Sequence, residues 1–485
     1  MTPDQLLSAL RQRGATLWAK QDQLHIKAPK GVLTPKLQQT LRQHKPTLLA
    51  LVQQQSAVAT ESDDFFLGDL TSEVVLDSSI QPKATPPDSQ HRPSAIFLTG
   101  ATGFLGAFIL QELLQRTQVN CYCLVRAADV SSGKQRIQTN LQAYGLWHEI
   151  NCDRIIPVIG DLGQPYFGLS PEQFQHLADQ IGCIYHSGAL LNYVYDYARL
   201  RSVNVQGTQE VLRLASCSQD APVHYVSSVA VFDSPAYAQK QILESDPLIH
   251  SEGIGLGYSQ SKWVAEKLMI SARDRGLPVC IYRVPFICGH SQTGVVNTND
   301  LICRLIKGCL QMGTAPDLDY QLDLAPVDYV SRSIIYLSQQ PDAIGQTFHL
   351  TNPKPYPWHQ LVSWIQSFGF AVKQIAYHDW LDQLHQIYSQ DNPLVPLRPF
   401  FRRQLPDTDL TLPELYQQAR RPKFDSQQTQ TVLDRAAIYC PSVNEQLLHT
   451  YFAYFLRTGF LVDTRQQLKC TLPKRTLLNA LQPEL

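Results

Sequence analysis

The feature that most constrains this chain is a glycine-rich segment between an apolar run and an amphipathic run. Residues 96–99 are apolar and predict a short buried strand. Three glycines follow at the spacing of a tight turn that opens a helix, and apolar residues then recur at helical spacing. Such glycines let the backbone turn and approach a pyrophosphate, and the helix N-terminus favours phosphate. The segment predicts a dinucleotide site that contains Gly100, Thr102, Gly103, Phe104, Leu105 and Gly106.

Strand-like and helix-like segments alternate beyond this turn. This alternation is typical of a parallel sheet with helices on both faces. We therefore predict an α/β fold over residues 69–352, a Rossmann-type doubly wound parallel sheet in its extended form, in which 288–325 contributes to the substrate site. The predicted strands are 96–99, 119–125, 155–159, 182–186, 222–227, 278–283 and 346–350.

The end of the second predicted strand indicates which dinucleotide binds. An acidic residue there would bind the ribose 2′-hydroxyl of NAD, whereas an arginine can pair with the 2′-phosphate of NADP. Leu124-Val-Arg126 has no acid at this position, so the sequence favours NADPH. Arg136 in the following helix is a second candidate contact, and a solvated helix arginine is the alternative.

Two further strand ends supply candidate contacts to the cofactor. Asp161, followed by Leu162, ends the third strand, where its carboxylate can accept a hydrogen bond from the adenine amine. Ser187, Gly188 and Ala189 follow the fourth strand, and their small size allows the cofactor to pass closely. A buried turn is the alternative for these three residues.

A tyrosine and a lysine four residues apart stand downstream of a strand that ends in serine. Residues at this spacing lie on one face of a helix, about 6 Å apart along its axis. We expect the Lys262 ammonium to lie beside the Tyr258 phenol and to lower its pKa, which would make the tyrosine a usable proton donor near neutral pH. Ser228, at the end of the 222–227 strand, can hydrogen-bond the substrate oxygen.

Composition excludes several classes of function. The formal net charge is −1, which offers no general attraction to nucleic acid or to a membrane surface, and no apolar stretch approaches the roughly 18 residues of a membrane span. The eleven cysteines show no paired spacing, so we predict reduced thiols, no metal site and a cytoplasmic location.

Residues 1–52 form a separate basic module. They hold eight Lys and Arg residues against Asp4 and Asp22, a net charge of +6. The pattern predicts a helix over 2–13, short strands around 17–19 and 24–26, and helices from residue 34 onward. Gln- and Ser-rich residues 53–68 follow as a linker, and 69–77 lead into the next domain. The order of elements resembles that of tubulysin-type docking domains of peptide synthetases; an undistinguished cap on the enzyme is the alternative.

The alternation of strands and helices stops after residue 352. Residues 358–368, 379–389 and 443–460 read as aromatic-rich helices, which predicts a smaller, mostly helical substrate domain over 353–485. The aromatic residues Tyr451, Phe452, Tyr454 and Phe455 could line an acyl channel, but core packing is the more common role of such a helix face.

Residues 69 to about 460 resemble the thioester reductase domains that terminate peptide and polyketide synthetase lines and carboxylic acid reductases, within the extended short-chain dehydrogenases. The motifs that carry the resemblance are Phe97-Leu-Thr-Gly-Ala-Thr-Gly-Phe-Leu-Gly106, Leu124-Val-Arg-Ala127, Gly160-Asp-Leu162, His186-Ser-Gly-Ala-Leu-Leu-Asn192, Asn204-Val-Gln-Gly-Thr208, Val226-Ser-Ser-Val229, Tyr258-Ser-Gln-Ser-Lys262, Tyr282-Arg283, Thr293-Gly294, Asn297, Asp300 and Pro326-Val-Asp328.

The resemblance implies NADPH-dependent reductive release of an acyl or peptidyl thioester carried on a phosphopantetheine arm, to an aldehyde or further to an alcohol. It implies that Ser228, Tyr258 and Lys262 are catalytic, and that the expected partners are a carrier protein and the C-terminal tail of an upstream synthetase subunit. It also implies cofactor contacts from Asn204, Tyr258, Lys262, Pro285 and Ile287.

This sequence departs from the family pattern at three places. The family usually has Asn at 187, Thr at 228 and Pro-Gly at 284–285, where this chain has Ser187, Ser228 and Val284-Pro285. Serine keeps the hydroxyl, whereas the change at 284–285 puts the nicotinamide contacts in doubt. Two alternatives stay open, namely a sugar-nucleotide epimerase or dehydratase of the same fold and a non-catalytic cofactor-binding scaffold.

Overall fold

The chain divides into two units, Met1–Leu67 and Gly68–Leu485. The computed structural model describes residues 16–20, 23–27, 69–83, 95–147, 149–218, 221–387, 389, 391–404, 410–417 and 420–462. In the first unit, β1 (Thr16–Lys20) and β2 (Gln23–Lys27) pair antiparallel, with Leu17 opposite Ile26. These are the two strands predicted around 17–19 and 24–26. The helices predicted for this module and the linker at 53–68 lie outside the described residues.

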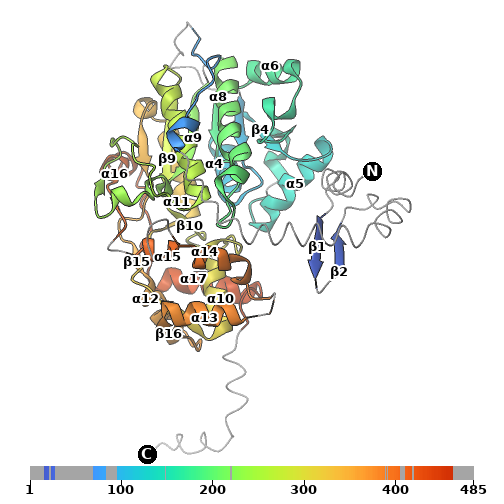
Figure 1. The fold of residues 1–485 in the computed structure, drawn as a ribbon. Helices are drawn as coiled ribbons and strands as arrows, with labels where there is room; N and C mark the ends of the chain where they lie inside the picture. Colours follow the sequence, from blue (N-terminus) through green and yellow to red (C-terminus); the bar gives the residue numbers. More distant parts are fainter. Residues whose placement is uncertain are drawn as a thin grey trace, which may run out of the picture. The chain divides into compact units, whose positions relative to one another are not determined.

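The second unit is built on a seven-stranded parallel sheet, which confirms the predicted fold class (Figure 1). All seven predicted strands are present, within a residue or two of the expected bounds. The strand order is β5-β4-β3-β6-β7-β9-β14. From β3 the chain first adds strands on one side, and with β6 it crosses to the other side of β3, so the order of addition reverses between these two parallel strands. The strands are β3 (Ala95–Thr99), β4 (Asn120–Val125), β5 (Ile155–Ile159), β6 (Cys183–His186), β7 (Val223–Ser228), β9 (Val279–Val284) and β14 (Thr347–His349).

Strands β3 and β9 are buried at every position, so their apolar side chains project from both faces of the sheet. Helices therefore cover both faces. One face packs against α4 (Phe104–Arg116), α5 (Val130–Ala143) and α11 (Val327–Ser338). The other packs against α6 (Pro171–Gln180), α8 (Gly207–Cys217) and α9 (Gly257–Asp274). Figure 1 shows α8 and α9 side by side on this second face. The turn between β3 and α4 lies at the strand-order reversal, where ligands of such sheets bind.

The lead-in predicted at 69–77 packs on the sheet domain, and the structure places residues 69–83 along its α8 and α9 face. Its carbonyl groups at Leu76, Asp77 and Ile80 all accept hydrogen bonds from the Arg275 guanidinium, at 2.6–2.9 Å. The Asp77 carboxylate pairs with Arg213 at 2.8 Å. These contacts attach an otherwise irregular segment to the sheet domain.

A smaller helical lobe follows the sheet and contains the helices predicted from residue 358 onward (Figure 1). The segment 288–325 joins this lobe through two short strand pairs, one between β11 (Thr314–Asp317) and β16 (Lys373–Ala376) and one between β12 (Gln321–Leu322) and β15 (Tyr356–Pro357). The lobe helices are α10 (Leu301–Met312), α12 (Trp358–Ser367), α13 (Tyr377–Gln386), α14 (Arg398–Arg402), α15 (Leu412–Leu415) and α17 (Glu445–Arg457).

The predicted single boundary at residue 352 is too simple. β17 (Lys423–Phe424) pairs with β8 (Gln241–Ile242), and α16 (Gln427–Asp434) packs on α11. Leu433 on α16 is fully buried in the core of the sheet domain. After β14 the chain therefore enters the lobe with α12 to α15, returns to the sheet domain with β17 and α16, and then completes the lobe with α17.

The aromatic face of α17 packs as core. Phe452 is 1% exposed and lies against the rings of Trp364, Phe368 and Phe370. The Tyr451 hydroxyl donates to the Gly289 carbonyl at 2.8 Å, which joins α17 to the segment after the last long strand. Of the two roles weighed for these aromatic residues, the structure supports packing. No helix in the described ranges has both the length and the apolar character required to cross a bilayer.

Candidate active site

The turn between β3 and α4 has the close packing that the glycine motif predicts. Gly100 has a φ of +84°, and a Cβ there would lie 2.8 Å from the Gly188 nitrogen. A Cβ at Gly106 would lie 2.0 Å from the Gly100 carbonyl oxygen, so only glycine allows the first turn of α4 to pack here. Gly103 is exposed and immediately precedes α4. The turn therefore fits a pyrophosphate, which can reach its bare backbone and the free N–H groups of α4.

Sequence reasoning missed the side chain that fixes the outer part of this turn. Asn140, on α5, donates from its amide to the carbonyl groups of Ala101 and Gly103, at 3.2 and 3.3 Å. A single asparagine within a helix gives no sequence signal for such a contact, because the contact depends on how α5 packs against the turn.

The two arginines expected near the adenosine ribose lie close together. Arg126 and Arg136 are both exposed, and Arg136 Nη1 donates to the Arg126 carbonyl at 2.7 Å. The structure thus gathers two cations just after β4, the strand whose end selects between NAD and NADP in folds of this type.

The other predicted cofactor residues lie along the same sheet edge. Asp161 follows β5 and accepts from the Gly163 backbone at 3.0 Å through Oδ1, which fixes the carboxylate, while Leu162 is buried beside it. Ser187 and Gly188 are half-buried after β6, and Ala189 is exposed. Contacts from these residues to a cofactor stay predictions.

A buried polar chain under the cofactor turn was not predicted. His186 Nδ1 lies 2.7 Å from the Thr99 hydroxyl and its Nε2 lies 3.1 Å from the Thr208 hydroxyl. The Gly188 nitrogen donates to Thr99 Oγ1 at 2.9 Å. Burial lowers the pKa of His186 to about 3, so its ring is neutral and serves as a connector between β3, β6 and α8.

The side-chain amide of Asn204 is hydrogen-bonded within the protein, and its predicted contact to a cofactor stays a prediction. Its Oδ1 accepts from the Leu190 nitrogen at 2.7 Å, and its Nδ2 donates to the Leu190 carbonyl and to Ser261 Oγ. The side chain is 3% exposed, so its polar atoms are directed at the protein. These hydrogen bonds position the 187–190 loop against α9.

Of the three predicted catalytic residues, Ser228 stands at the carboxyl end of β7, and Tyr258 and Lys262 lie on α9, which packs against β7 and the turn after it. Ser228 ends β7, and its Oγ accepts from the Ala230 nitrogen at 3.1 Å. Tyr258 is the second residue of α9, whose start packs so closely that a Cβ on Gly257 would lie 2.5 Å from the Tyr195 carbonyl oxygen. Lys262 is 3% exposed, donates from Nζ to the Val226 carbonyl at 2.7 Å, and lies 4.2 Å from the centre of the Tyr225 ring.

The expectation that Lys262 lowers the pKa of Tyr258 is wrong for this structure. Burial, and after it the negative charge of Asp233, raises the pKa of the Tyr258 phenol well above its ordinary value. Burial lowers the pKa of the Lys262 ammonium to about 7. Desolvation disfavours the charged form of both groups and is the largest cause of both shifts. The phenol is therefore protonated at neutral pH, which is the form that a proton donor needs.

Residues 284–287, which are expected near the nicotinamide, link β9 to the short strand β10 (Phe286–Cys288). Pro285 is buried between β9 and β10, and Ile287 is half-buried in the pair that β10 makes with β13 (Leu324–Pro326). Their predicted cofactor contacts stay predictions. Across the described ranges, no group of three or more His, Cys, Asp or Glu side chains could hold a metal ion.

The fold and this site define a class of enzyme. A doubly wound parallel sheet with a glycine turn at its reversal point, and a serine, a tyrosine and a lysine at the same edge, is the arrangement of short-chain dehydrogenases and reductases that use a nicotinamide dinucleotide. Comparison with known proteins agrees. Residues 98–334 match the NAD-binding family described as "Male sterility protein", and residues 4–54 match the "TubC N-terminal docking domain".

One solved structure fixes the family. The terminal R domain from the myxalamid PKS-NRPS biosynthetic pathway is 43% identical, with a TM-score of 0.76, over 81% of this chain and 98% of that one. This chain therefore belongs to the family of terminal reductase domains of peptide and polyketide synthetases. A reductase domain from Mycobacterium tuberculosis, 24% identical with a TM-score of 0.65 over 80% of this chain and 99% of that one, shares the fold.

The curated relatives are much longer proteins. A linear gramicidin synthase polypeptide of Brevibacillus parabrevis is 38% identical over 401 residues, which is 82% of this chain but 8% of the synthase polypeptide. The large subunit of L-2-aminoadipate reductase of Penicillium chrysogenum is 33% identical over 425 residues, 83% of this chain and 30% of that protein. This chain thus spans less than a third of either relative.

Proposed function

We propose that this chain uses NADPH to reduce an acyl or peptidyl thioester, carried on the phosphopantetheine arm of a carrier protein, and releases it as an aldehyde. The observation that supports this proposal is the placement of Ser228 at the end of β7 and of Tyr258 and Lys262 on α9, which packs against β7, in a chain that is 43% identical to a terminal R domain. Thioester-dependent oxidation of NADPH with release of a free thiol is its test.

Each of the three side chains has a separate task in this reaction. When bound at the glycine turn, NADPH would supply the hydride that the thioester carbonyl carbon accepts. Ser228 and Tyr258 donate hydrogen bonds to the carbonyl oxygen, which becomes negative as that carbon becomes tetrahedral, and Tyr258 then gives it a proton. Lys262 lies one turn along α9 from the tyrosine and stabilises the phenolate that results.

The product follows from the balance of bonds. Addition of one hydride and one proton to the thioester gives a hemithioacetal, whose carbon–sulfur bond then breaks to leave an aldehyde and the pantetheine thiol. A second round with another NADPH would reduce the aldehyde to an alcohol. The same donors serve both steps, because each step develops negative charge on the same oxygen.

The preference for NADPH rests on the two exposed arginines after β4. We expect Arg126→Ala to weaken NADPH binding by about 10- to 100-fold, because a charge-assisted hydrogen bond to the 2′-phosphate is lost. NADH binding should change little, since NADH lacks that phosphate. Dissociation constants of both cofactors, measured by fluorescence titration, check this expectation.

The matched control for Arg126 is Arg116→Ala. Arg116 is another partly exposed arginine, at the far end of α4, where it pairs with Glu112 at 2.6 Å. Its loss should leave both dissociation constants near the wild-type values. Equal weakening of NADPH and NADH by Arg126→Ala would instead make Arg126 a structural residue.

The match of residues 4–54 to a docking domain supports a partner for the N-terminal unit. We propose that residues 1–52 bind the acidic C-terminal tail of an upstream synthetase subunit, for two reasons. Their net charge of +6 speeds encounter with an acidic segment, and β1 and β2 offer a strand edge to a peptide. Such contacts should be weak, on the order of micromolar, and salt-sensitive.

Deletion of residues 1–52 separates docking from chemistry. We expect the shortened protein to reduce a free pantetheine thioester as fast as the full chain. It should reduce the same acyl group on the intact upstream subunit more slowly, because tethering gives an effective concentration of roughly millimolar. Steady-state rates with both substrates check this. If both rates fall together, the module is part of the enzyme's fold; if neither falls, docking is the wrong account.

The two alternatives have less support. A protein in complex with UDP-glucuronic acid and NAD is 16% identical with a TM-score of 0.50, a likeness that extends to the fold alone. A scaffold that only binds a cofactor would not require the buried Lys262 beside a protonated tyrosine, and burial of a lysine costs stability.

A further inference from the structure

One buried carboxylate connects the two catalytic hydroxyl groups. Asp233 follows the single-turn helix η5 (Val229–Phe232), and Ser228 precedes it, so the two residues cap opposite ends of the same turn. The Ser228 hydroxyl accepts from the Ala230 nitrogen, and the Asp233 nitrogen donates to the Ala230 carbonyl at 3.2 Å. A shift of Asp233 would therefore move the turn that fixes Ser228.

The same carboxylate is attached to the helix that carries Tyr258. Its Oδ2 accepts from the Ser259 hydroxyl at 2.6 Å, and Ser259 is fully buried next to Tyr258 in the first turn of α9. Asp233 thus joins the end of β7 to the start of α9.

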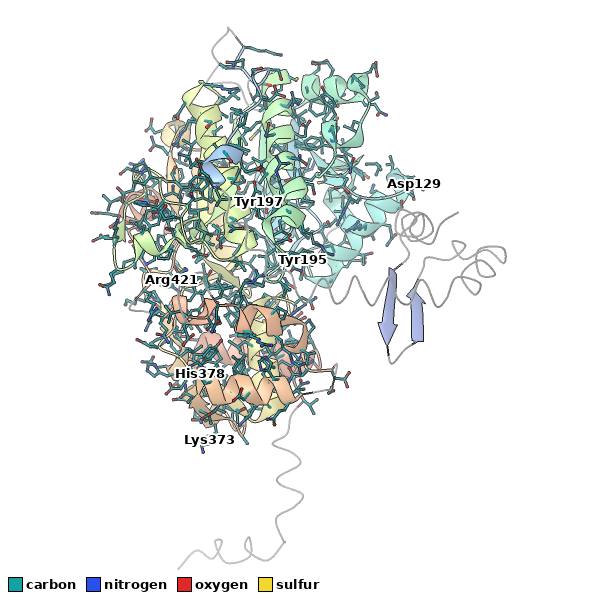
Figure 2. All side chains as sticks on the ribbon, viewed as in Figure 1. Asp129, Tyr195, Tyr197, Lys373, His378 and Arg421 are labelled. Atoms are coloured by element: carbon teal, nitrogen blue, oxygen red, sulfur yellow. The ribbon has the colours of Figure 1, made fainter. Side chains whose placement is uncertain are left out.

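The remaining partners of the carboxylate come from the segment after α15. Tyr416 donates from its hydroxyl to Asp233 Oδ2 at 2.6 Å, and Arg421 donates from Nη1 to Oδ1 at 2.7 Å. The Arg421 guanidinium also lies over the Tyr416 ring, 4.7 Å from its centre. Gln417 forms a bridge with Tyr320, which anchors this segment to the helical lobe. Figure 2 shows Arg421 at the level where the sheet domain meets the lobe.

The burial of Asp233 makes its hydrogen bonds and its ion pair necessary for stability. The Asp233 side chain is 2% exposed and carries a charge that only hydrogen-bonding donors and an opposite charge can compensate. Arg421 is the cation in its ion pair. When one partner of such a pair is removed, the other charge stays buried, and local structure adjusts to solvate it.

We infer that Asp233 and Arg421 form a positioning pair that fixes Ser228 and Tyr258 against each other and ties their geometry to the placement of the helical lobe. The kinetic consequences of this inference rest on the proposed reduction. Neither residue touches the substrate in this account, because both act through the turn at 229–232 and the start of α9.

The primary test is Arg421→Gln, which removes the charge but keeps a polar side chain. We expect kcat for the thioester to fall about tenfold or more, because small displacements of aligned groups carry penalties of that size. KM for NADPH should stay near the wild-type value, since the glycine turn is untouched. Arg421→Lys should restore part of kcat, because it keeps the charge without the planar fork.

The dependence of kcat on pH gives a second readout. The titratable groups that act on the Tyr258 phenol are Asp233, Tyr193 and Tyr225, and Lys262 lies one turn further along the same helix. Without the Arg421 cation, the Asp233 carboxylate acts more strongly on the Tyr258 phenol and raises its pKa further, so the alkaline limb of kcat should move to higher pH. Asp233→Asn removes that charge and should move the limb to lower pH.

Tyr416→Phe is the matched control. It removes one hydrogen bond to Asp233 and leaves the charges and the ring in place. We expect a smaller loss of kcat and an alkaline limb at the wild-type position.

Hydrogen exchange tests the pair without any substrate. In Arg421→Gln, amide exchange should increase at 229–236 and 256–262 while the rest of the sheet keeps its protection. Unchanged kcat with unchanged exchange would overturn the inference, and so would exchange that increases throughout the protein. A wild-type enzyme that fails to reduce thioesters would overturn the proposed function alone, because the exchange result would still decide the role of the pair.

Discussion

Tyr258→Phe is expected to lower thioester turnover by about 10² or more, the usual scale for loss of a general acid. A tyrosine phenol is ordinarily protonated at neutral pH, and burial raises the pKa of Tyr258 further, so its hydroxyl is available to protonate the substrate oxygen. Phenylalanine keeps the ring and therefore the packing of the first turn of α9. Single-turnover rates with NADPH and an acyl-pantetheine thioester measure the effect.

Two comparisons give this result its meaning. NADPH affinity of Tyr258→Phe should stay close to that of the wild type, because the pyrophosphate turn and the arginines after β4 are unchanged. Tyr439→Phe removes a hydroxyl from a tyrosine that is 64% exposed, and it should leave turnover unchanged. Turnover of Tyr258→Phe at the wild-type rate would remove the acid role from this residue.

Glu266→Leu is expected to destabilise the protein by about 3–5 kcal/mol, the typical cost of leaving a buried charge without its partner. Glu266 Oε1 lies 2.7 Å from Arg283 Nη2, and both side chains are at most 2% exposed. Ser227 donates to the same carboxylate, and Arg283 Nη1 donates to His349, whose ring burial keeps neutral by lowering its pKa to about 3. The free energy of unfolding, from denaturant titration, measures the loss.

The control for this prediction is the partly exposed pair of Glu112 and Arg116, whose side chains are 14% and 38% exposed. Glu112→Gln should change stability by less than about 1 kcal/mol, because solvent screens such a pair. The double variant Glu266→Leu, Arg283→Met should recover part of the loss, since no uncompensated charge remains. A Glu266→Leu protein as stable as Glu112→Gln would contradict the account of the buried pair.

The sheet could be predicted from sequence because its strands carry local signals. Each is a short apolar run bounded by a turn or a helical pattern, and the glycine spacing at Gly100 and Gly106 reflects contacts that exclude any side chain. The placement of Ser228, Tyr258 and Lys262 could be predicted for a similar reason. Ser228 stands at the end of a strand, and Tyr258 and Lys262 stand four residues apart on one helix.

The features that sequence did not show depend on distant contacts or on burial. Asp233 and Arg421 are 188 residues apart, and nothing local marks either as half of a pair. The return of 420–440 to the sheet domain depends on the packing of Leu433 against α11. The error over the pKa of Tyr258 has the same origin, since spacing predicts the nearby lysine but not the desolvation that raises the pKa of the phenol.

The most direct test of the proposed function measures the stoichiometry of one reaction. The full chain is incubated with NADPH and a synthetic acyl-pantetheine thioester, and oxidised cofactor, free thiol and aldehyde are measured together. Reductive release predicts one thiol and one aldehyde for each NADPH oxidised, or one thiol and one alcohol for every two. An inert thioester, together with turnover of a nucleotide sugar without net NADPH consumption, would contradict it.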